Sequence, residues 1–377
     1  MFKLNLFCFA LYAIFTTSSQ ASTSDKASLG QTLFFDTRLS INNAQSCATC
    51  HNPQHAFIDN RENSRFRMVS EGADGQSFGN RNTPTAMYGA FHQTFSYDEK
   101  RQTYKGGVFW DGRAADLAAQ AGQPPLNPVE MQMPSKEALV QRLSTIDFYQ
   151  ESFKKIYGTD IWNNTDKAYQ AMEDAIASFE KTKEFAPFDS KYDRYLRGEY
   201  ELSPLEDLGR TLFFSNNNVN CKTCHSLKAE DSPEELFTNF EYHNIGVPRN
   251  LKLMVLNQLN DHFRDQGLLD NPLVSGDTKQ AGKFKTPTLR NVAVTGPYMH
   301  NGVFKDLRTV ILFYDKFNNP ERTLNPETGE PWGEPEVAET VNLTDLKANA
   351  LSDRKVDALV AFLKTLTDAR YEHLLDK

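Results

Sequence analysis

Cysteine is scarce in this chain, since its 377 residues contain only five. Cys8 lies in the N-terminal segment, and the other four belong to two short motifs at residues 47–51 and 221–225. An exported protein would be free to form disulfides. With four cysteines committed to the motifs, however, the sequence predicts no structural disulfide.

Long apolar runs are also missing beyond the N-terminal segment. Residues 1–21 carry Lys3, an apolar run from Leu4 to Phe15 and a small-residue end at Ser19-Gln20-Ala21, which is typical of a cleaved secretory signal. No later run approaches the ~20 apolar residues of a membrane helix. We therefore expect an exported protein that has lost Cys8 and has no membrane span.

Positive charge is in deficit. The chain has 41 Lys and Arg against 49 Asp and Glu, a formal net charge of −8. Nucleic acid and anionic lipid are therefore poor candidate partners. An acidic face could instead accept a basic partner protein.

Both cysteine motifs read Cys-x-x-Cys-His. At this spacing two thiols can bond to the two vinyl groups of one haem while the adjacent imidazole ligates its iron. A redox dithiol or half of a zinc site is the alternative, but neither requires a His directly after the second Cys. Because c-type haems are attached after export, the sequence predicts two covalent haem c groups and a bacterial periplasmic location, with the motif residues Cys47, Cys50, His51, Cys221, Cys224 and His225.

An internal repeat precedes the two motifs. Leu29-Gly-Gln-Thr-Leu-Phe-Phe35 leads to the first and Leu208-Gly-Arg-Thr-Leu-Phe-Phe214 to the second. The second copy begins with Ser203, Pro204 and Glu206, which is the pattern of a capping box with Pro at the first helical position. Each copy predicts an apolar helix followed by a haem loop.

Helical periodicity recurs elsewhere and strand patterns are weak, so the predicted fold is mainly α, with two cytochrome c-like haem domains related by the repeat. We expect a first domain at residues 22–190 and a second at 191–377, whose C-terminal segment could pack back on the first. The expected helices cover residues 136–143, 167–179 and 354–366, the expected crossover covers 183–200, and long loops cover 72–84 and 318–335.

Four further segments carry a family resemblance. They are Phe109-Trp-Asp-Gly-Arg113, the stretch from Gln120 through Pro124 to Met131, Thr286-Pro-Thr-Leu-Arg-Asn291, and Thr295-Gly-Pro-Tyr-Met-His-Asn-Gly302. In content, order and spacing they resemble the bacterial dihaem cytochrome c peroxidase and MauG family over nearly the whole mature chain.

The resemblance implies that the first haem is the peroxide site, with Gln120, Pro124 and Glu130 on its distal side. A carboxylate there can take a proton from bound hydrogen peroxide and return it to the departing hydroxyl, which makes Glu130 the candidate acid and base. Trp110 resembles the tryptophan that couples the two haems. The alternatives are a solvated Glu in a Pro-rich loop and a Trp that only packs in the core.

A calcium site is also implied by the resemblance and by nothing else in the sequence. Asn82 would supply a side-chain oxygen, and Thr295 and Pro297 would supply backbone carbonyls. Calcium prefers oxygen donors and accepts waters in its remaining positions.

The first departure from the conventional pattern is a missing histidine. Conventional members carry a His in the loop before Asn-x-Pro-Thr, where it caps the oxidised first iron. Residues 69–80 contain no His here, so we expect an open first haem that needs no reductive activation. His55 and His92 are the nearby alternatives, and His55 is more typical of a packed or surface residue.

The second departure concerns the far side of the second haem. Conventional members have a Met fourteen residues after the position of His300, whereas this chain has Tyr314. MauG-type members use a tyrosine there, and a phenolate oxygen stabilises a more oxidised iron than a thioether does. Met299 and Met254 remain alternative ligands, and Tyr314 could also be a core aromatic.

Three functions follow from these features. The first is a MauG-like oxidase, which reacts with peroxide at the open haem and oxidises a periplasmic partner protein by hole hopping. The second is a peroxidase that takes electrons from a small cytochrome or cupredoxin, and the third is a non-catalytic dihaem carrier or sensor. Trp162 and Trp332 are candidate exit points for a hole, although each could simply pack.

Overall fold

The computed structural model describes residues 23–61, 68–215, 219–228, 234–274 and 276–375. The secretory signal expected at residues 1–21 lies outside these ranges. Among the described residues no helix is both long and apolar enough to cross a bilayer.

The fold is mainly helical, as the sequence predicts. The strands are only two or three residues long and form two small antiparallel sheets, β1 with β2 and β3 with β4. In chain order the helices and strands are α1 (Thr23–Phe34), α2 (Cys47–Cys50), β1 (Ser96–Asp98), β2 (Thr103–Lys105), α3 (Leu117–Ala121), α4 (Lys136–Ser144), α5 (Asp147–Tyr157), α6 (Thr165–Glu180), α7 (Lys191–Leu196), α8 (Pro204–Phe214), α9 (Cys221–Cys224), β3 (Tyr242–His243), α10 (Leu251–Leu256), β4 (Phe284–Lys285), α11 (Leu307–Asp315), α12 (Leu343–Leu346) and α13 (Asp353–Lys364).

The helices expected from periodicity are confirmed as α4, α6 and α13. The capping box at the start of α8 is also confirmed, because the Ser203 backbone donates to the Glu206 carboxylate at 2.7 Å and the Glu206 backbone donates to the Ser203 hydroxyl at 3.3 Å. The expected crossover differs, since it contains α7. A second capping box, between Ser190 and Asp193, starts that helix.

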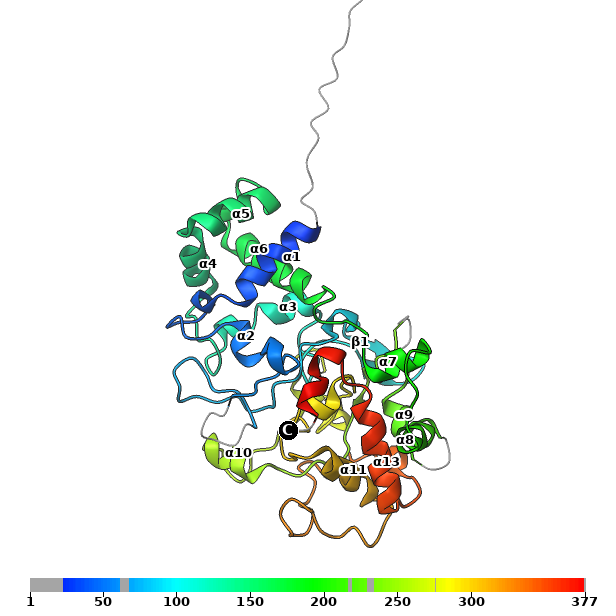
Figure 1. The fold of residues 1–377 in the computed structure, drawn as a ribbon. Helices are drawn as coiled ribbons and strands as arrows, with labels where there is room; N and C mark the ends of the chain where they lie inside the picture. Colours follow the sequence, from blue (N-terminus) through cyan, green and yellow to red (C-terminus); the bar gives the residue numbers. More distant parts are fainter. Residues whose placement is uncertain (1–22, 62–67, 216–218, 229–233, 275, 376–377) are drawn as a thin grey trace, which may run out of the picture.

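Two helix pairs make the same close contact. α1 packs on α6 and α8 packs on α13 (Figure 1). A Cβ on Gly30 would lie 1.9 Å from the carbonyl oxygen of Ala175, and one on Gly209 would lie 1.9 Å from that of Ala358. Only glycine fits either position, so the Gly of each Leu-Gly-x-Thr-Leu-Phe-Phe segment sets how closely its helix approaches the partner.

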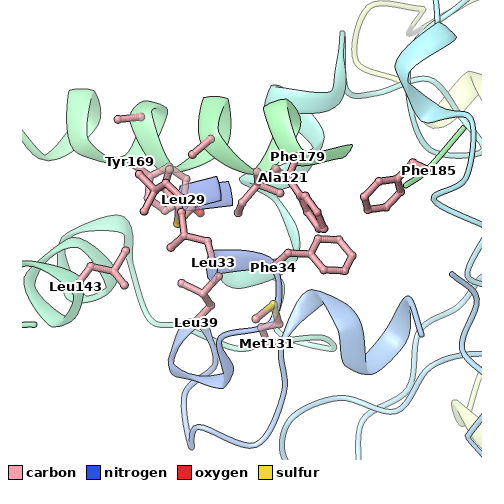
Figure 2. Close-up of a cluster of buried hydrophobic side chains, with 14 of the residues drawn as sticks. Leu29, Leu33, Phe34, Leu39, Ala121, Met131, Leu143, Tyr169, Phe179 and Phe185 are labelled. Carbon is pink, nitrogen blue, oxygen red and sulfur yellow. The ribbon is translucent and has the colours of Figure 1, made fainter. Parts of the chain in front are cut away.

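The buried side chains form two main hydrophobic clusters. One gathers around α1 and α6, where Phe34 lies edge-on to Phe179 and Phe185 (Figure 2). The other gathers around α8, α11 and α13 and includes Phe213 and Phe362. Each haem motif therefore follows a helix that carries its own buried cluster.

The C-terminal segment lies between the two groups of helices and is drawn in red in Figure 1. The Tyr371 hydroxyl donates to the carbonyl of Pro53 at 2.8 Å. Asp368, fully buried, accepts hydrogen bonds from the Tyr88 hydroxyl at 2.6 Å and from the Asn291 amide at 2.7 Å. This segment thus joins residues near the first motif to residues beyond the second.

Candidate haem and peroxide site

The two motif histidines have matching surroundings. The Nδ1 atom of His51 lies 3.0 Å from the carbonyl oxygen of Phe57, and that of His225 lies 3.0 Å from the carbonyl oxygen of Phe237. Burial lowers the pKa of both imidazoles, and that of His225 falls to about 4. A neutral ring that donates from Nδ1 leaves Nε2 free for an iron, which is the state a proximal ligand needs.

A large cavity opens beside the second motif. Cys221, Cys224, His225, Trp110 and Tyr314 all line it. Both cysteines, the proximal ligand and the candidate sixth ligand therefore face one space. The residues present fit a covalently attached haem that Cys221, Cys224 and His225 would hold.

Tyr314 lies at the C-terminal end of α11. Burial raises the pKa of Tyr314, and the thiols of Cys224 and Cys221 add to the rise, so its phenol is in electrostatic reach of the second motif. Met299 lines the same cavity, whereas Met254 lies beside Arg249 and is not among the cavity residues that the structure describes. Tyr314 and Met299 thus remain the two candidates that the structure brings to the second motif.

Among the described residues, the zinc alternative has one possible ligand set near the second motif. Cys224, His243 and Asp345 each offer an atom within 4.8 Å of the others. The set would need the sulfur that a haem also needs, and His225 has no part in it. The haem interpretation uses every residue of the motif, so it accounts for more of the sequence.

The three distal candidates of the first haem lie in one compact segment. Gln120 is in α3, Pro124 begins a 3₁₀ turn at Pro124–Leu126, and Glu130 follows that turn. The carbonyl of Gln120 accepts from the backbone of Gln123 at 3.0 Å, and that of Pro124 accepts from Met131 at 3.2 Å. Short backbone hydrogen bonds therefore hold all three near one another.

Glu130 is half-buried and electrostatically perturbed. Burial raises its pKa, while the Arg113 guanidinium and a 2.8 Å hydrogen bond from the Asn127 amide work against that rise. The Glu130 carboxylate contributes, after burial, to the raised pKa of both Cys47 and Cys50. It is therefore close enough to the first motif for its charge to be felt there.

The loop at residues 69–80 is fixed against the distal segment. The Ala73 backbone donates to the carbonyl of Glu130 at 2.7 Å, and the Asn42 amide donates to the carbonyl of Ala73 at 2.5 Å. In conventional members this loop carries the His that caps the iron. In this chain the loop instead contacts Glu130 through the backbone of Ala73.

Neither alternative histidine occupies the distal segment. His55 lies beside Asn52, next to the proximal ligand. His92 is edge-on to Phe240, with ring centroids 5.3 Å apart, and its buried Nδ1 lacks a partner in the described part of the chain.

Trp110 lies where the two halves of the chain meet. Trp110 lines the large cavity beside the second motif, and its Nε1 donates to the carbonyl of Asn82 at 2.8 Å. Its own carbonyl accepts from the Lys285 backbone at 2.9 Å. Trp110 is thus held by Asn82 and Lys285, the residues that directly precede the two Thr-Pro-Thr segments at 83–85 and 286–288.

Most of the residues expected to bind calcium border one small cavity. Asn82, Thr83, Asp59 and Thr295 line it, whereas Pro297 does not. The Asn82 amide nitrogen donates to the carbonyl of Met68 at 3.0 Å, which leaves its oxygen to face elsewhere. A site bordered by amide, hydroxyl, carboxylate and carbonyl oxygens fits a hard cation such as calcium.

The two other tryptophans pack in the interior. Trp162 lies against Phe153, with ring centroids 4.7 Å apart, and donates to the carbonyl of Gln150. Trp332 lies edge-on to Phe304 and donates to the carbonyl of Arg322 at 2.8 Å. Both are half-buried, so their contacts give neither a particular role as an exit point.

The sequence did not predict one feature of this region, a buried lysine and a buried histidine. Lys285 and His300 both line the large cavity beside the second motif, and both are buried, at 7% and 3% exposure. Lys285 precedes the second Thr-Pro-Thr as Asn82 precedes the first, and that parallel was the signal that could have singled it out.

Comparison with known proteins identifies the family of this chain. Residues 24–201 match the family described as di-haem cytochrome c peroxidase. The chain is 51% identical over 384 residues to the methylamine utilization protein MauG of Paracoccus denitrificans, covering 99% of this chain and 98% of that one. The chain therefore belongs to the dihaem cytochrome c peroxidase and MauG family, and it is a dihaem peroxidase-type oxidoreductase that acts on peroxide.

Two more distant relatives are named as peroxidases. The cytochrome c peroxidase Ccp of Escherichia coli is 32% identical over 282 residues, covering 74% of this chain and 50% of that one. The crystal structure of the dihaem peroxidase BthA from Burkholderia thailandensis superposes with a TM-score of 0.82 at 30% identity, covering 94% of this chain and 90% of that one. Family membership implies two haem c groups.

Proposed function

We propose that this protein reacts with hydrogen peroxide at the His51 haem and passes the oxidising equivalents, through Trp110 and the Tyr314-ligated haem, to a periplasmic partner protein. The observation that carries the proposal is that the two motifs differ in the residues that lie opposite their histidines. Tyr314 shares a cavity with Cys221, Cys224 and His225, whereas the first motif faces a segment with Glu130 and a loop without His.

The two haems, when bound, supply the redox chemistry, and the side chains supply binding and proton transfer. Glu130 accepts a proton from peroxide and delivers it to the departing hydroxyl. Asn127 orients its carboxylate through the 2.8 Å hydrogen bond. Gln120 and Pro124 shape the space in which peroxide binds.

Two cytochrome c-like haem domains, at residues 22–190 and 191–377, provide the scaffold in this proposal. The matching contacts of Gly30 and Gly209 and the two hydrophobic clusters support the division. A calcium ion at Asn82, Thr295 and Pro297 would hold the domains together beside Trp110. The periplasm and an N-terminal secretory signal complete the proposal and rest on the sequence.

The decisive experiment is a titration of the as-isolated diferric protein with peroxide, followed by absorption and EPR spectroscopy of both irons. We expect an immediate change at both haems without prior reduction. Tyr314→Met should confine the change to the first haem, while Tyr298→Phe, which keeps the cavity wall and leaves Tyr314 intact, should behave like the wild type. A diferric protein that stays inert until it is reduced would refute the proposal.

A peroxidase that consumes electrons from a small cytochrome or cupredoxin is the second candidate. The likeness to the Escherichia coli and Burkholderia thailandensis peroxidases favours it. It predicts fast, repeated turnover with a reduced c-type donor. Rapid reaction with peroxide beside sluggish donor oxidation would favour a partner-protein oxidase instead.

A non-catalytic carrier or sensor would need both irons to be six-coordinate. The distal segment with Glu130 has no purpose in such a protein. A high-spin ferric signal in the resting spectrum would exclude it.

A further inference from the structure

Asn82 and Lys285 occupy matching places in the two halves of the chain. Each directly precedes a Thr-Pro-Thr segment. The last threonine of each segment donates to a backbone carbonyl, Thr85 to Ala56 at 2.5 Å and Thr288 to Leu236 at 2.7 Å. Each of these carbonyls belongs to the residue just before Phe57 or Phe237, whose carbonyls face the motif histidines. The two segments therefore dock on the two haem loops in the same way.

The turns that carry Trp110 and His300 match as well. Val108 bridges to Ala114 and Tyr298 bridges to Phe304, so each turn closes over the same number of residues. The second residue of each turn has positive φ, 67° at Phe109 and 71° at Met299. Trp110 therefore corresponds to His300, and Gly107, one residue before its turn, corresponds to Pro297.

The two halves exchange contacts through these elements. The Asn82 backbone donates to the carbonyl of His300 at 2.6 Å, and the Lys285 backbone donates to the carbonyl of Trp110 at 2.9 Å. The residue that directly precedes each Thr-Pro-Thr segment thus binds the turn that belongs to the other half. We call these two contacts crossings: the first joins Asn82 to the His300 turn, and the second joins Lys285 to the Trp110 turn. Both crossings have the same pattern of backbone hydrogen bonds.

The side chains complete the correspondence. In the calcium site that the family resemblance implies, the Asn82 side chain and the Pro297 carbonyl would share a cation, and the neighbouring Gly296 borders the small cavity beside Asn82 while Pro297 itself does not. At the other crossing their counterparts are the Lys285 side chain and the Gly107 carbonyl, and Lys285 Nζ donates directly to that carbonyl at 2.6 Å. We propose that the Lys285 ammonium is a built-in cation that takes, at this crossing, the place of the calcium ion at the first.

The surroundings of Lys285 suit such a role. Asp111, 3% exposed, favours the charged form, although burial lowers the pKa of Lys285 to about 7. Asp111 is itself paired with Arg81 at 2.5 Å and Arg113 at 3.0 Å. Lys285 holds Gly107 through its side chain and Trp110 through its backbone, so it is a positioning residue for the Trp110 turn. The inference rests on the proposed calcium site.

Calcium stoichiometry tests the inference directly. The purified two-haem protein is equilibrated with calcium, desalted and measured by elemental analysis. We expect one calcium per chain in the wild type, two in Lys285→Asn and one in Lys285→Met. Lys283→Asn, which changes the half-buried neighbouring lysine, is the matched control and should keep one.

The reverse exchange keeps the test decisive if Lys285→Asn fails to fold. Asn82→Lys should lose calcium and yet melt at a temperature that no longer depends on added calcium and lies above that of Asn82→Ala. Equal calcium in Lys285→Asn and Lys285→Met would overturn the inference, as would equal melting temperatures of Asn82→Lys and Asn82→Ala. A wild type without calcium would instead remove the proposed calcium site, and this inference with it, while leaving the peroxide reaction untouched.

Discussion

The indole Nε1 of Trp110 donates a 2.8 Å hydrogen bond to the backbone carbonyl of Asn82. The candidate relay between the haems is thereby tied to the candidate calcium ligand. Trp110→Phe keeps an aromatic ring, removes this donor and also loses the volume of the second indole ring. Because the Asn82 carbonyl then lacks its partner, we expect calcium to bind about tenfold more weakly, the equivalent of ~1.4 kcal/mol.

Competition with a chelator measures this change in affinity. Trp162→Phe is the matched control, since that indole donates to the carbonyl of Gln150, away from Asn82. Unchanged calcium affinity in Trp110→Phe would show that the hydrogen bond does not support the ion.

The pH dependence of the peroxide reaction should report Glu130. Burial raises the pKa of Glu130, and only the deprotonated carboxylate can accept a proton. The rate should therefore rise with pH through a value above the usual 4.5 of a glutamate. Glu130→Gln should remove this limb and slow the reaction by about 10²- to 10⁴-fold, whereas Glu137→Gln, an exposed neighbour on α4, should leave the profile intact.

Asn127 offers a second measurement of the same group. Its hydrogen bond helps to lower the pKa of Glu130, so Asn127→Ala should move the acidic limb to higher pH. A limb that stays in place, measured by stopped-flow kinetics over the same pH range, would assign it to another residue.

The local features of the fold could be predicted from the sequence. α8 follows from Ser203, Pro204 and Glu206 because a capping box acts within one turn. α7 could have been predicted in the same way from Ser190 and Asp193. Its surroundings, with Pro187 and Gly198, are typical of a linker, and this signal outweighs the short capping pattern.

The relations between the two halves could not be predicted in this way. The crossings of Asn82 with His300 and of Lys285 with Trp110 join residues more than a hundred positions apart. Periodicity and capping carry no information about such pairs. The family resemblance predicted roles for Asn82, Trp110 and Glu130 but not for Lys285. Nothing distinguishes Lys285 from other lysines in the sequence until its carbonyl partner, Gly107, is known.

The glycines of the repeat make a prediction about packing. Gly30→Ala and Gly209→Ala each place a Cβ 1.9 Å from a backbone oxygen of the facing helix, so the helices must move apart. We expect each to lower the free energy of unfolding by at least ~1–3 kcal/mol. Gly79→Ala, whose nearest atom would be 3.6 Å away, is the control. Thermal unfolding of the three variants checks this, and equal melting temperatures would contradict it.

The buried ion pair between Arg290 and Asp193 makes the last prediction. Arg290 is 1% exposed, and its two terminal nitrogens contact the Asp193 carboxylate at 2.8 and 3.0 Å. Asp193→Ala leaves that guanidinium buried without its carboxylate, so we expect a loss of about 3–5 kcal/mol. Asp207→Ala, which breaks the exposed pair with Arg210, should cost about 0–1 kcal/mol.

The pH dependence of this loss follows from the same contact. Burial alone would raise the pKa of Asp193, but the Arg290 hydrogen bonds hold it below its usual 3.8. A carboxyl group whose pKa is lower in the folded state stabilises the fold above its unfolded pKa and loses that contribution as the pH falls. The gap between the wild type and Asp193→Ala in urea unfolding should therefore be full near neutral pH and shrink below about pH 4. A gap that does not change with pH would mean that the loss comes from packing rather than from the charge on Asp193.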